Sequence, residues 1–148
     1  MFERRKRLRL ERALNDNELN LLKPYFQSRT LDLVRIVEGH VPFWLHKSMC
    51  AVVLQHRIYL RAELDKISFY EPASYKSSVH QTGFAASVEL LAHELTHVEQ
   101  YLSGMTIIKY LWASRHGYWK NPYEMEAYAK STFVRQQIFS SDINKTNI

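Results

Sequence analysis

The feature that most constrains this chain is a five-residue motif inside a long amphipathic segment. Residues 93–97 read His-Glu-Leu-Thr-His, the pattern H-E-x-x-H. On a helix, histidines at positions i and i+4 project from the same face, about one turn apart. Two imidazole nitrogens so arranged can occupy two corners of a zinc tetrahedron, and the intervening glutamate can deprotonate a metal-activated water. We therefore predict zinc ligands at His93 and His97 and a general base at Glu94.

The apolar pattern around the motif predicts a long helix over residues 84–103. Its apolar positions follow 4-3-4-3-4 spacing and form one narrow stripe: Phe84, Val88, Leu91, Leu95, Val98 and Leu102. At about 100° per residue, the two histidines lie on nearly the opposite side. The helix is therefore expected to bury two faces, one in the core and one at the histidine site. Gly104 is placed to end it in a left-handed conformation.

A catalytic zinc commonly has three protein ligands and one open position, so a third ligand is expected. Asn121 and Pro122 are start signals for a last helix, predicted to run to about Phe139. Glu124 and Glu126 stand near its beginning, two positions apart, and therefore cannot face the same way. Glu124 is the favoured ligand. Two alternatives stay open: Glu124 forms only a capping box with Asn121, or Glu126 is the ligand.

The remaining local patterns predict a small sheet before the long helix. The expected elements are, in order, a short helix from about residue 16 to 26, a half-buried strand over 31–37, a hairpin or one bulged strand over 51–54 and 57–60, a loop over 68–83 and a short helix over 107–112. The fold class expected is α+β, with a small sheet packed on the central motif helix, followed by the helix that carries the third ligand.

Length and charge bound the domain organisation. A chain of 148 residues fits one domain, which we place at 16–148. Residues 1–15 are expected to form a basic arm, because residues 1–12 carry six basic side chains against two acidic ones. Such an arm suits nucleic acid, anionic lipid or an acidic partner, or is simply a solvated terminus. No apolar segment follows the basic start, so a cytoplasmic location without a signal peptide is expected, with export by a secretion system left open.

Two stretches resemble a known family. Residues 90–100, Leu-Leu-Ala-His-Glu-Leu-Thr-His-Val-Glu-Gln, resemble the zinc helix of gluzincin metallopeptidases. They look closest to the small metallopeptidase-like core domain of extracellular contractile injection system proteins, whose downstream element is similar to Asn-Pro-Tyr-Glu-Met-Glu-Ala at 121–127. The resemblance covers roughly residues 50–130. It implies a zincin-like domain with zinc bound by His93, His97 and Glu124 and with Glu94 as catalytic base.

The chain also departs from that family. Tyr128 stands where gluzincins commonly carry an acidic or amide residue that orients a zinc histidine, so its phenol is expected to accept from an imidazole N–H. Little chain follows residue 140 to build a second subdomain, so we expect a shallow cleft, or one completed by a partner or a second copy. An extended substrate is expected to pair with a strand edge near Arg57–Arg61.

The predicted function is a zinc-dependent peptidase that hydrolyses peptide bonds through a metal-activated water. The oxyanion is expected to receive a hydrogen bond from Tyr118 or His116, or less readily from Tyr123. The four remaining histidines show no ligand spacing and are expected at the surface: His40, His46, His56 and His80. One alternative is a catalytically weak or latent zinc-stabilised interaction module, such as a component or cargo of a secretion assembly. Another is a nucleic-acid-associated regulator that uses the basic arm.

Overall fold

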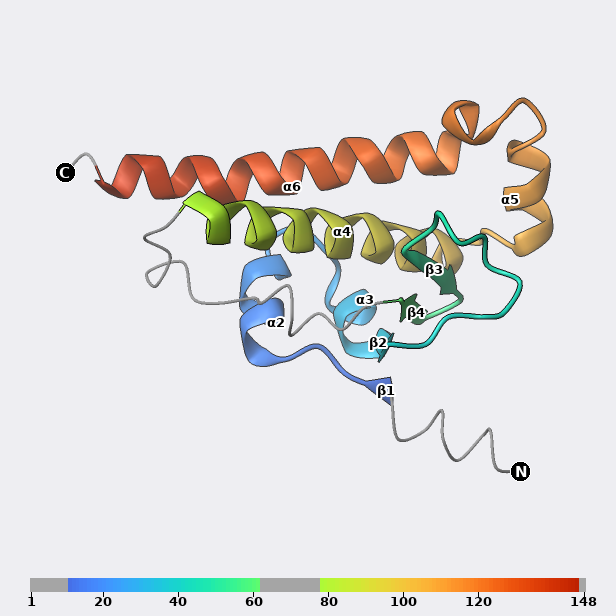
Figure 1. The fold of residues 1–148 in the computed structure, drawn as a ribbon, viewed down its shortest axis with the longest axis horizontal. Coiled ribbons are helices and arrows are strands. Elements are labelled where there is room, and N and C mark those ends of the chain that lie inside the picture. The colour runs from blue at the N-terminus through green and yellow to red at the C-terminus, as the bar shows by residue number, and fades with distance from the viewer. Residues whose placement is uncertain (1–10, 62–77, 147–148) are drawn as a thin grey trace.

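The fold is built around one central helix, α4 (Ser78–Leu102). Figure 1 shows a small sheet and two short helices on one side of α4, and a second long helix, α6 (Pro122–Thr146), on the other side, running in the opposite direction. This computed structural model describes residues 11–61 and 78–146, with side chains described for 11–61 and 86–140. The expected α+β class is confirmed. Residues 11–15, which we expected in the basic arm, contribute β1 (Glu11–Arg12) and the core side chain of Leu14.

The sheet has four short strands in the order β1-β2-β4-β3. Their bounds are Glu11–Arg12 (β1), Arg35–Glu38 (β2), Ala51–Leu54 (β3) and Arg57–Leu60 (β4). β3 and β4 form an antiparallel hairpin, which resolves the choice between a hairpin and one bulged strand, while β2 and β4 are parallel. Because β4 is paired on both sides, the substrate edge predicted near Arg57–Arg61 is wrong. The edge on that side of the sheet is β3.

The strand predicted over residues 31–37 is also wrong in its first half. The chain forms helix α3 (Ser28–Leu33) there, and β2 begins only afterwards. Leu31 and Val34, three positions apart, are both buried while Leu33 is 42% exposed, which is the spacing of a helix and not the alternation of a strand. Glu99 of α4 accepts a hydrogen bond from the amide just before α3, at a helix N-terminus where negative charge is favourable. Tertiary contact therefore decides between two local patterns.

The apolar stripe of α4 is confirmed where its side chains are described. Val88, Leu91, Leu95 and Val98 are all at most 1% exposed and belong to the main core, which they share with the sheet and the short helices. α4 starts at residue 78, so the last part of the predicted loop is helical. Residues 78–83 have weak helix propensity, but they extend a helix that is already formed. Extension avoids the free-energy cost of nucleation, which is larger than the propensity cost of these residues. Gly104, with a φ of 111°, ends the helix as predicted.

The other helices follow the expected order. They are α2 (Asp16–Leu22), α5 (Ile107–Ala113) and a short 3-10 turn, η3 (Tyr118–Lys120), which precedes α6. α5 matches the predicted short helix, whereas α2 ends just before Pro24 and α6 extends beyond the expected end at Phe139. Residues 1–10 of the predicted basic arm lie outside the described residues, and Arg12 of β1 pairs with the buried carboxylate of Glu18. None of the helices described is both long and apolar enough to cross a membrane.

Candidate metal centre

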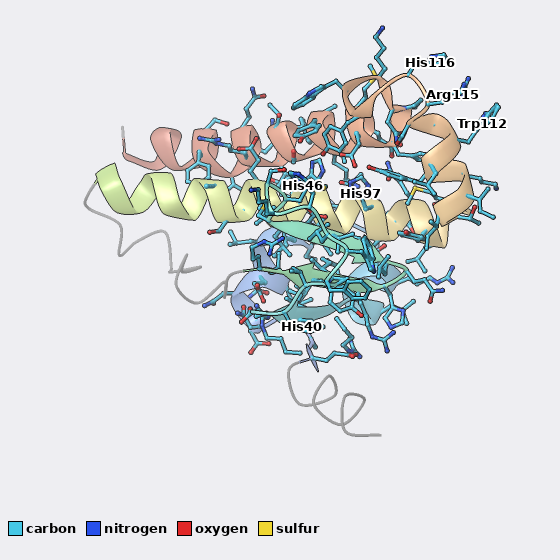
Figure 2. All side chains as sticks on the ribbon, turned by 45° about the vertical axis from the view of Figure 1, so that its right-hand side comes forward. His40, His46, His97, Trp112, Arg115 and His116 are labelled. Atoms are coloured by element: carbon cyan, nitrogen blue, oxygen red, sulfur yellow. The ribbon has the colours of Figure 1, made fainter. Side chains whose placement is uncertain are left out.

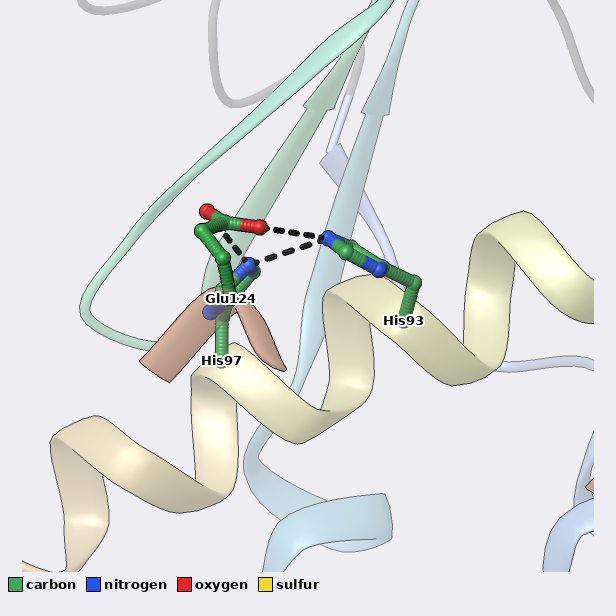
Figure 3. Close-up of side chains that lie close together, drawn as sticks. All are labelled: His93, His97 and Glu124. Atoms are coloured by element: carbon green, nitrogen blue, oxygen red, sulfur yellow. Dashed lines mark hydrogen bonds and ion pairs between the residues drawn. The ribbon is translucent and has the colours of Figure 1, made fainter. Parts of the chain in front are cut away.

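Three side chains from two helices meet at one point beside the sheet. α4 contributes His93 and His97, and the first turn of α6 contributes Glu124 (Figure 3). The Nε2 atoms of the two histidines are 3.2 Å apart. The carboxylate oxygens of Glu124 lie 3.1 Å from Nε2 of His93 and 3.2 Å from Nε2 of His97. The structure therefore brings together the three ligands that the sequence favoured.

The donor atoms fit a tetrahedral zinc ion in chemistry and in spacing. Zinc bonds to imidazole nitrogen and carboxylate oxygen are about 2.0–2.2 Å long, which places neighbouring corners of the tetrahedron about 3.3 Å apart. The observed separations of 3.1–3.2 Å between nitrogen and oxygen or nitrogen and nitrogen are close to that edge. Two imidazoles and one carboxylate also form a ligand set that catalytic zinc sites use, since it leaves one position open. The residues present thus fit the metal.

Glu124 is directed at the histidines, and Glu126 is not. Glu124 is only 4% exposed, whereas Glu126 is exposed on another face of α6. The capping-only alternative for Glu124 fails as well, because its carboxylate does not bond to the Asn121 amide, which donates instead to the carbonyl of Tyr118. Asn121 caps α6 by accepting from the backbone amide of Tyr123 at 2.9 Å. The start signals in the sequence therefore position Glu124 while leaving its carboxylate available.

His97 is oriented by a hydrogen-bond chain that the sequence did not reveal. Gln100 lies one turn further along α4, and its amide nitrogen donates to the carbonyl of Tyr123 at 2.9 Å. This contact fixes the amide so that its oxygen faces Nδ1 of His97 at 2.8 Å. With a metal on Nε2, Nδ1 would carry the proton and donate it to this oxygen. Such outer contacts are what hold a metal-binding imidazole in the correct tautomer.

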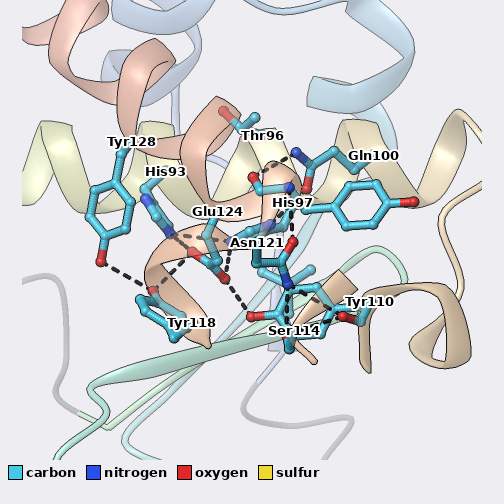
Figure 4. A network of polar contacts seen from close by, with 12 residues as sticks. His93, Thr96, His97, Gln100, Tyr110, Ser114, Tyr118, Asn121, Glu124 and Tyr128 are labelled. Atoms are coloured by element: carbon cyan, nitrogen blue, oxygen red, sulfur yellow. Dashed lines mark hydrogen bonds and ion pairs between the residues drawn. The ribbon is translucent and has the colours of Figure 1, made fainter. Parts of the chain in front are cut away.

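The carboxylate of Glu124 is held by two phenols. Tyr110 donates to its Oε1 atom at 2.6 Å, and Tyr118 donates to Oε2 at 2.8 Å (Figure 4). Tyr110 reaches the site because Asn121 ties the end of α5 to the beginning of α6, donating to the hydroxyl of Ser114 at 2.7 Å. Burial raises the pKa of both tyrosines, and the hydrogen bonds to Glu124 raise it further. Both phenols therefore stay protonated and act as donors.

Tyr128 does not play the role expected of it. Its ring packs edge-on against His93, with ring centroids 4.4 Å apart. Its hydroxyl pairs with that of Tyr118 at 3.1 Å rather than accepting from an imidazole. Tyr128 therefore limits the rotation of the His93 ring by packing and supports the Tyr118 hydroxyl from behind. The expected acceptor function belongs to Gln100 and acts on His97.

Burial and the carboxylates set the charge of the site. Burial by itself lowers the pKa of His97, but Glu124 outweighs it and the pKa is raised. For Glu124 burial acts upward, and the hydrogen bonds from His93 and His97 hold its pKa well below the ordinary value. The pKa of Glu94 is raised by burial against the opposing pull of the two histidines. In the absence of metal, Glu124 is thus the ionised carboxylate and Glu94 the one inclined to hold a proton.

Two cavities meet at Glu94. An apolar cavity of about 500 Å³ is lined by His93, Glu94 and His97 together with β3, α5 and the segment before β3. A second cavity, of about 630 Å³, also reaches His93 and Glu94 from the side of Trp119. Tyr118 lines both. Water or a substrate can therefore reach Glu94 and the histidine nitrogens, although each of these residues is less than one tenth exposed.

None of the other predicted polar candidates joins the group of His93, His97 and Glu124 among the described residues. His116 is exposed on the turn after α5 and lines neither cavity, so it is not placed to stabilise an oxyanion here. Tyr123 stacks on Tyr110 behind the site. His40 is exposed and His56 partly exposed, while the side chain of His80 lies outside the described residues. His46 is also exposed, but it lines the second cavity with His93 and Glu94. Of the three oxyanion candidates, Tyr118 alone lines the cavities.

Two residues of the site were missed from the sequence, for different reasons. Gln100 stands three positions after His97 on the same helix, and that spacing was a usable signal for a side chain that can reach an imidazole. Tyr110 had no such signal, because its position depends on how α5 folds back over the cavity.

Comparisons of the chain with protein-family models, with curated proteins and with solved structures give no significant match. The function is therefore inferred from the site itself.

Proposed function

We propose that this protein is a zinc-dependent peptidase of zincin-like, gluzincin type. The observation that supports it most is the buried group of His93, His97 and Glu124, with Glu94 beside it on the wall of an apolar cavity. Two histidines and a glutamate hold a metal, and a second glutamate one residue from a ligand is available as a base. Hydrolysis by a metal-activated water requires both, a set of metal ligands and a separate base.

Zinc bound by these residues would supply a Lewis acid that polarises a carbonyl and makes a nearby water more acidic. Glu94 is suited to the proton transfers. Among the described residues it has no hydrogen-bond partner, and it faces both cavities. Burial raises the pKa of this carboxyl above its ordinary value, which is the direction in which enzymes adjust a glutamate base. Glu94 takes a proton from the attacking water and then passes it to the leaving amine.

The cavity favours an extended peptide as substrate. β3 lies at the edge of the sheet, and all four of its residues line the apolar cavity. A peptide that pairs with this edge gains main-chain hydrogen bonds while it passes close to Glu94. The corrected edge is thus nearer to the site than the one expected from the sequence. The opposite wall is formed by α5, so one short helix stands where larger gluzincins have a subdomain.

Tyr118 is the donor best placed to stabilise negative charge on a substrate oxygen. Its phenol lines both cavities and keeps its proton, because burial and Glu124 raise its pKa. Its hydroxyl already lies 2.8 Å from an oxygen of Glu124, so it points towards the group of ligands. The phenol has one proton, so its hydroxyl would turn from Glu124 to donate to an oxyanion.

The test compares wild type with Glu94→Gln, an isosteric change that removes the base and leaves all three ligands in place. Zinc content is measured on both proteins, and cleavage of a peptide library is measured with and without a chelator. We expect one zinc per chain in both, with chelator-sensitive cleavage only in the wild type. Equal cleavage by both proteins would refute the role of Glu94, and absence of zinc from both would refute the metal centre.

The same experiment separates the peptidase from the alternative function. A zinc-stabilised interaction module, for example a component or cargo of a secretion assembly, would bind zinc in both proteins and cleave no peptide. Removal of the metal would then lower the melting temperature, because the ligands join α4 to α6 and their metal-binding energy contributes to folding. Thermal melts with and without chelator therefore belong beside the cleavage assay.

A further inference from the structure

All three tryptophans of the chain are exposed. Trp44 is 56% exposed, Trp112 69% and Trp119 75%. Tryptophan is usually well buried in a folded protein, since its large ring gains free energy on leaving water. Three exposed tryptophans on a small domain indicate a surface that meets something other than water.

Helix α5 carries the largest part of this surface. Ile107, Ile108, Leu111 and Trp112 are between 52% and 80% exposed. They recur at four-residue spacing and so share the outward face of α5, whereas Tyr110 points inward to Glu124. None of the residues of α5 is buried. A helix in the described part of the chain therefore presents an apolar face with no protein partner.

The segment before β3 adds to the same surface. Trp44 lines the apolar cavity together with Ile107 and Leu111, which places these side chains around one opening. Phe43, next to Trp44, is fully exposed. We call this surface the apolar rim: Phe43, Trp44, Ile107, Ile108, Leu111 and Trp112. Figure 2 shows Trp112 and Arg115 projecting outward at the end of the molecule formed by α5.

The segments that carry the apolar rim contain no acidic side chains. Residues 100–123 contain no aspartate or glutamate but include Lys109, Arg115 and Lys120, and residues 39–61 also lack acidic side chains. The guanidinium of Arg115 lies over the ring of Trp112 at 4.7 Å, so a cation accompanies the most exposed aromatic part of α5. Exposed tryptophan and isoleucine on segments whose charged side chains are all basic are characteristic of proteins that lie in the interface of an anionic bilayer.

We propose that the apolar rim docks on the surface of an anionic lipid bilayer, with Ile108 and Trp112 inserted among the headgroups and the lysine and arginine side chains against lipid phosphates. The charge argues against a second copy as the occupant, because a symmetric dimer through this surface would bring the same basic side chains together. The opening of the apolar cavity would then face the bilayer. The docking is independent of zinc and of any peptidase activity.

The test uses the full chain and vesicles of phosphatidylcholine, with or without phosphatidylglycerol. Binding is measured by co-sedimentation and by intrinsic fluorescence, which reports on the rim because Trp44 and Trp112 belong to it. The variant Ile108→Ser/Trp112→Ser removes two rim side chains that line neither cavity, and it retains Trp44 and Trp119 as reporters. The control Leu33→Ser/Phe133→Ser removes two exposed apolar side chains on α3 and α6.

We expect wild type and control to bind the anionic vesicles with a blue shift, and the rim variant to bind at least about tenfold more weakly with unchanged zinc content. Binding should also weaken with added salt and on neutral vesicles. The proposal is overturned if wild type does not bind anionic vesicles, or if the rim variant binds as tightly, which would assign the attraction to the basic residues 1–12. A dimer in light scattering that only the rim variant abolishes would assign the rim to a second copy instead.

Discussion

Replacement of Gln100 tests whether the contacts behind the ligands control the metal centre. In the metal-free protein the His97 ring can hold its proton on either nitrogen. A bound metal occupies Nε2, so Nδ1 must carry the proton, and Gln100 accepts it at 2.8 Å. Gln100→Ala removes that acceptor and leaves a buried N–H without a partner in the zinc-bound state only. The loss should therefore be measurable as weaker zinc binding.

The size of the effect follows from the hydrogen bond. An unpaired buried donor costs about 1–3 kcal/mol, and every 1.4 kcal/mol is about tenfold in affinity, so the zinc dissociation constant should rise about 5- to 150-fold. Mutations of residues that orient metal ligands typically cost about 10- to 100-fold, which is the same range. Competition with a chromophoric chelator, on protein shown to be folded by circular dichroism, measures this change.

Two further variants make the result specific to the acceptor. Gln100→Glu keeps an oxygen near Nδ1 of His97 while losing the donor to the Tyr123 carbonyl, so zinc affinity should stay within a few-fold of wild type. Glu126→Gln, an exposed change on α6, should leave the affinity unchanged. The reasoning is refuted if Gln100→Ala binds zinc within twofold of wild type, or if Gln100→Glu is as weak as Gln100→Ala.

Three other predictions use simple assays. Glu124→Ala should weaken zinc binding by at least about 100-fold and Glu126→Ala by less than about twofold, and the reverse ranking would move the third ligand. Without metal, burial lowers the pKa of His97 but Glu124 raises it above the ordinary value of 6.5, so the stability that His97 contributes is present below pH 6.5 and lost as pH rises. The pKa of Glu124 is lowered, so the stability that Glu124 contributes is present above pH 4.5 and lost on acidification. The melting temperature of chelator-treated protein should therefore be highest between pH 4.5 and 6.5. Zinc should move this maximum to higher pH, because protons compete with the metal for His97. A melting temperature that does not vary with pH would contradict the ion pair between His97 and Glu124. Leu95→Ala should destabilise the fold by about 2–5 kcal/mol in urea denaturation, because Leu95 is fully buried, whereas Leu33→Ala, 42% exposed, should change stability by about 0.5 kcal/mol or less.

Local spacing was enough to place the three site residues that belong to α4. His93, Glu94 and His97 stand within one and a half turns of a single helix, so their common face follows from helix geometry alone. The buried stripe of α4 followed from the same periodicity, and Gly104 marked its end. Glu124 was favoured because a helix start signal preceded it. These features depend on residues close in sequence, where backbone geometry fixes which side chains share a face.

Tertiary structure decided everything that depends on contact between elements. The antiparallel packing of α4 and α6 directed Glu124 rather than Glu126 at the histidines, and the return of α5 over the cavity brought Tyr110 to Glu124. Residues 31–37 alternate like a strand, but their first half forms a helix whose N-terminus is bonded to Glu99. The strand order places β3 at the edge of the sheet, where β4 was expected. The sequence by itself determined which residues could bind a metal, because ligand spacing on one helix is a local property. Only the fold determined how they are oriented and what reaches them, because those contacts join residues far apart in the chain.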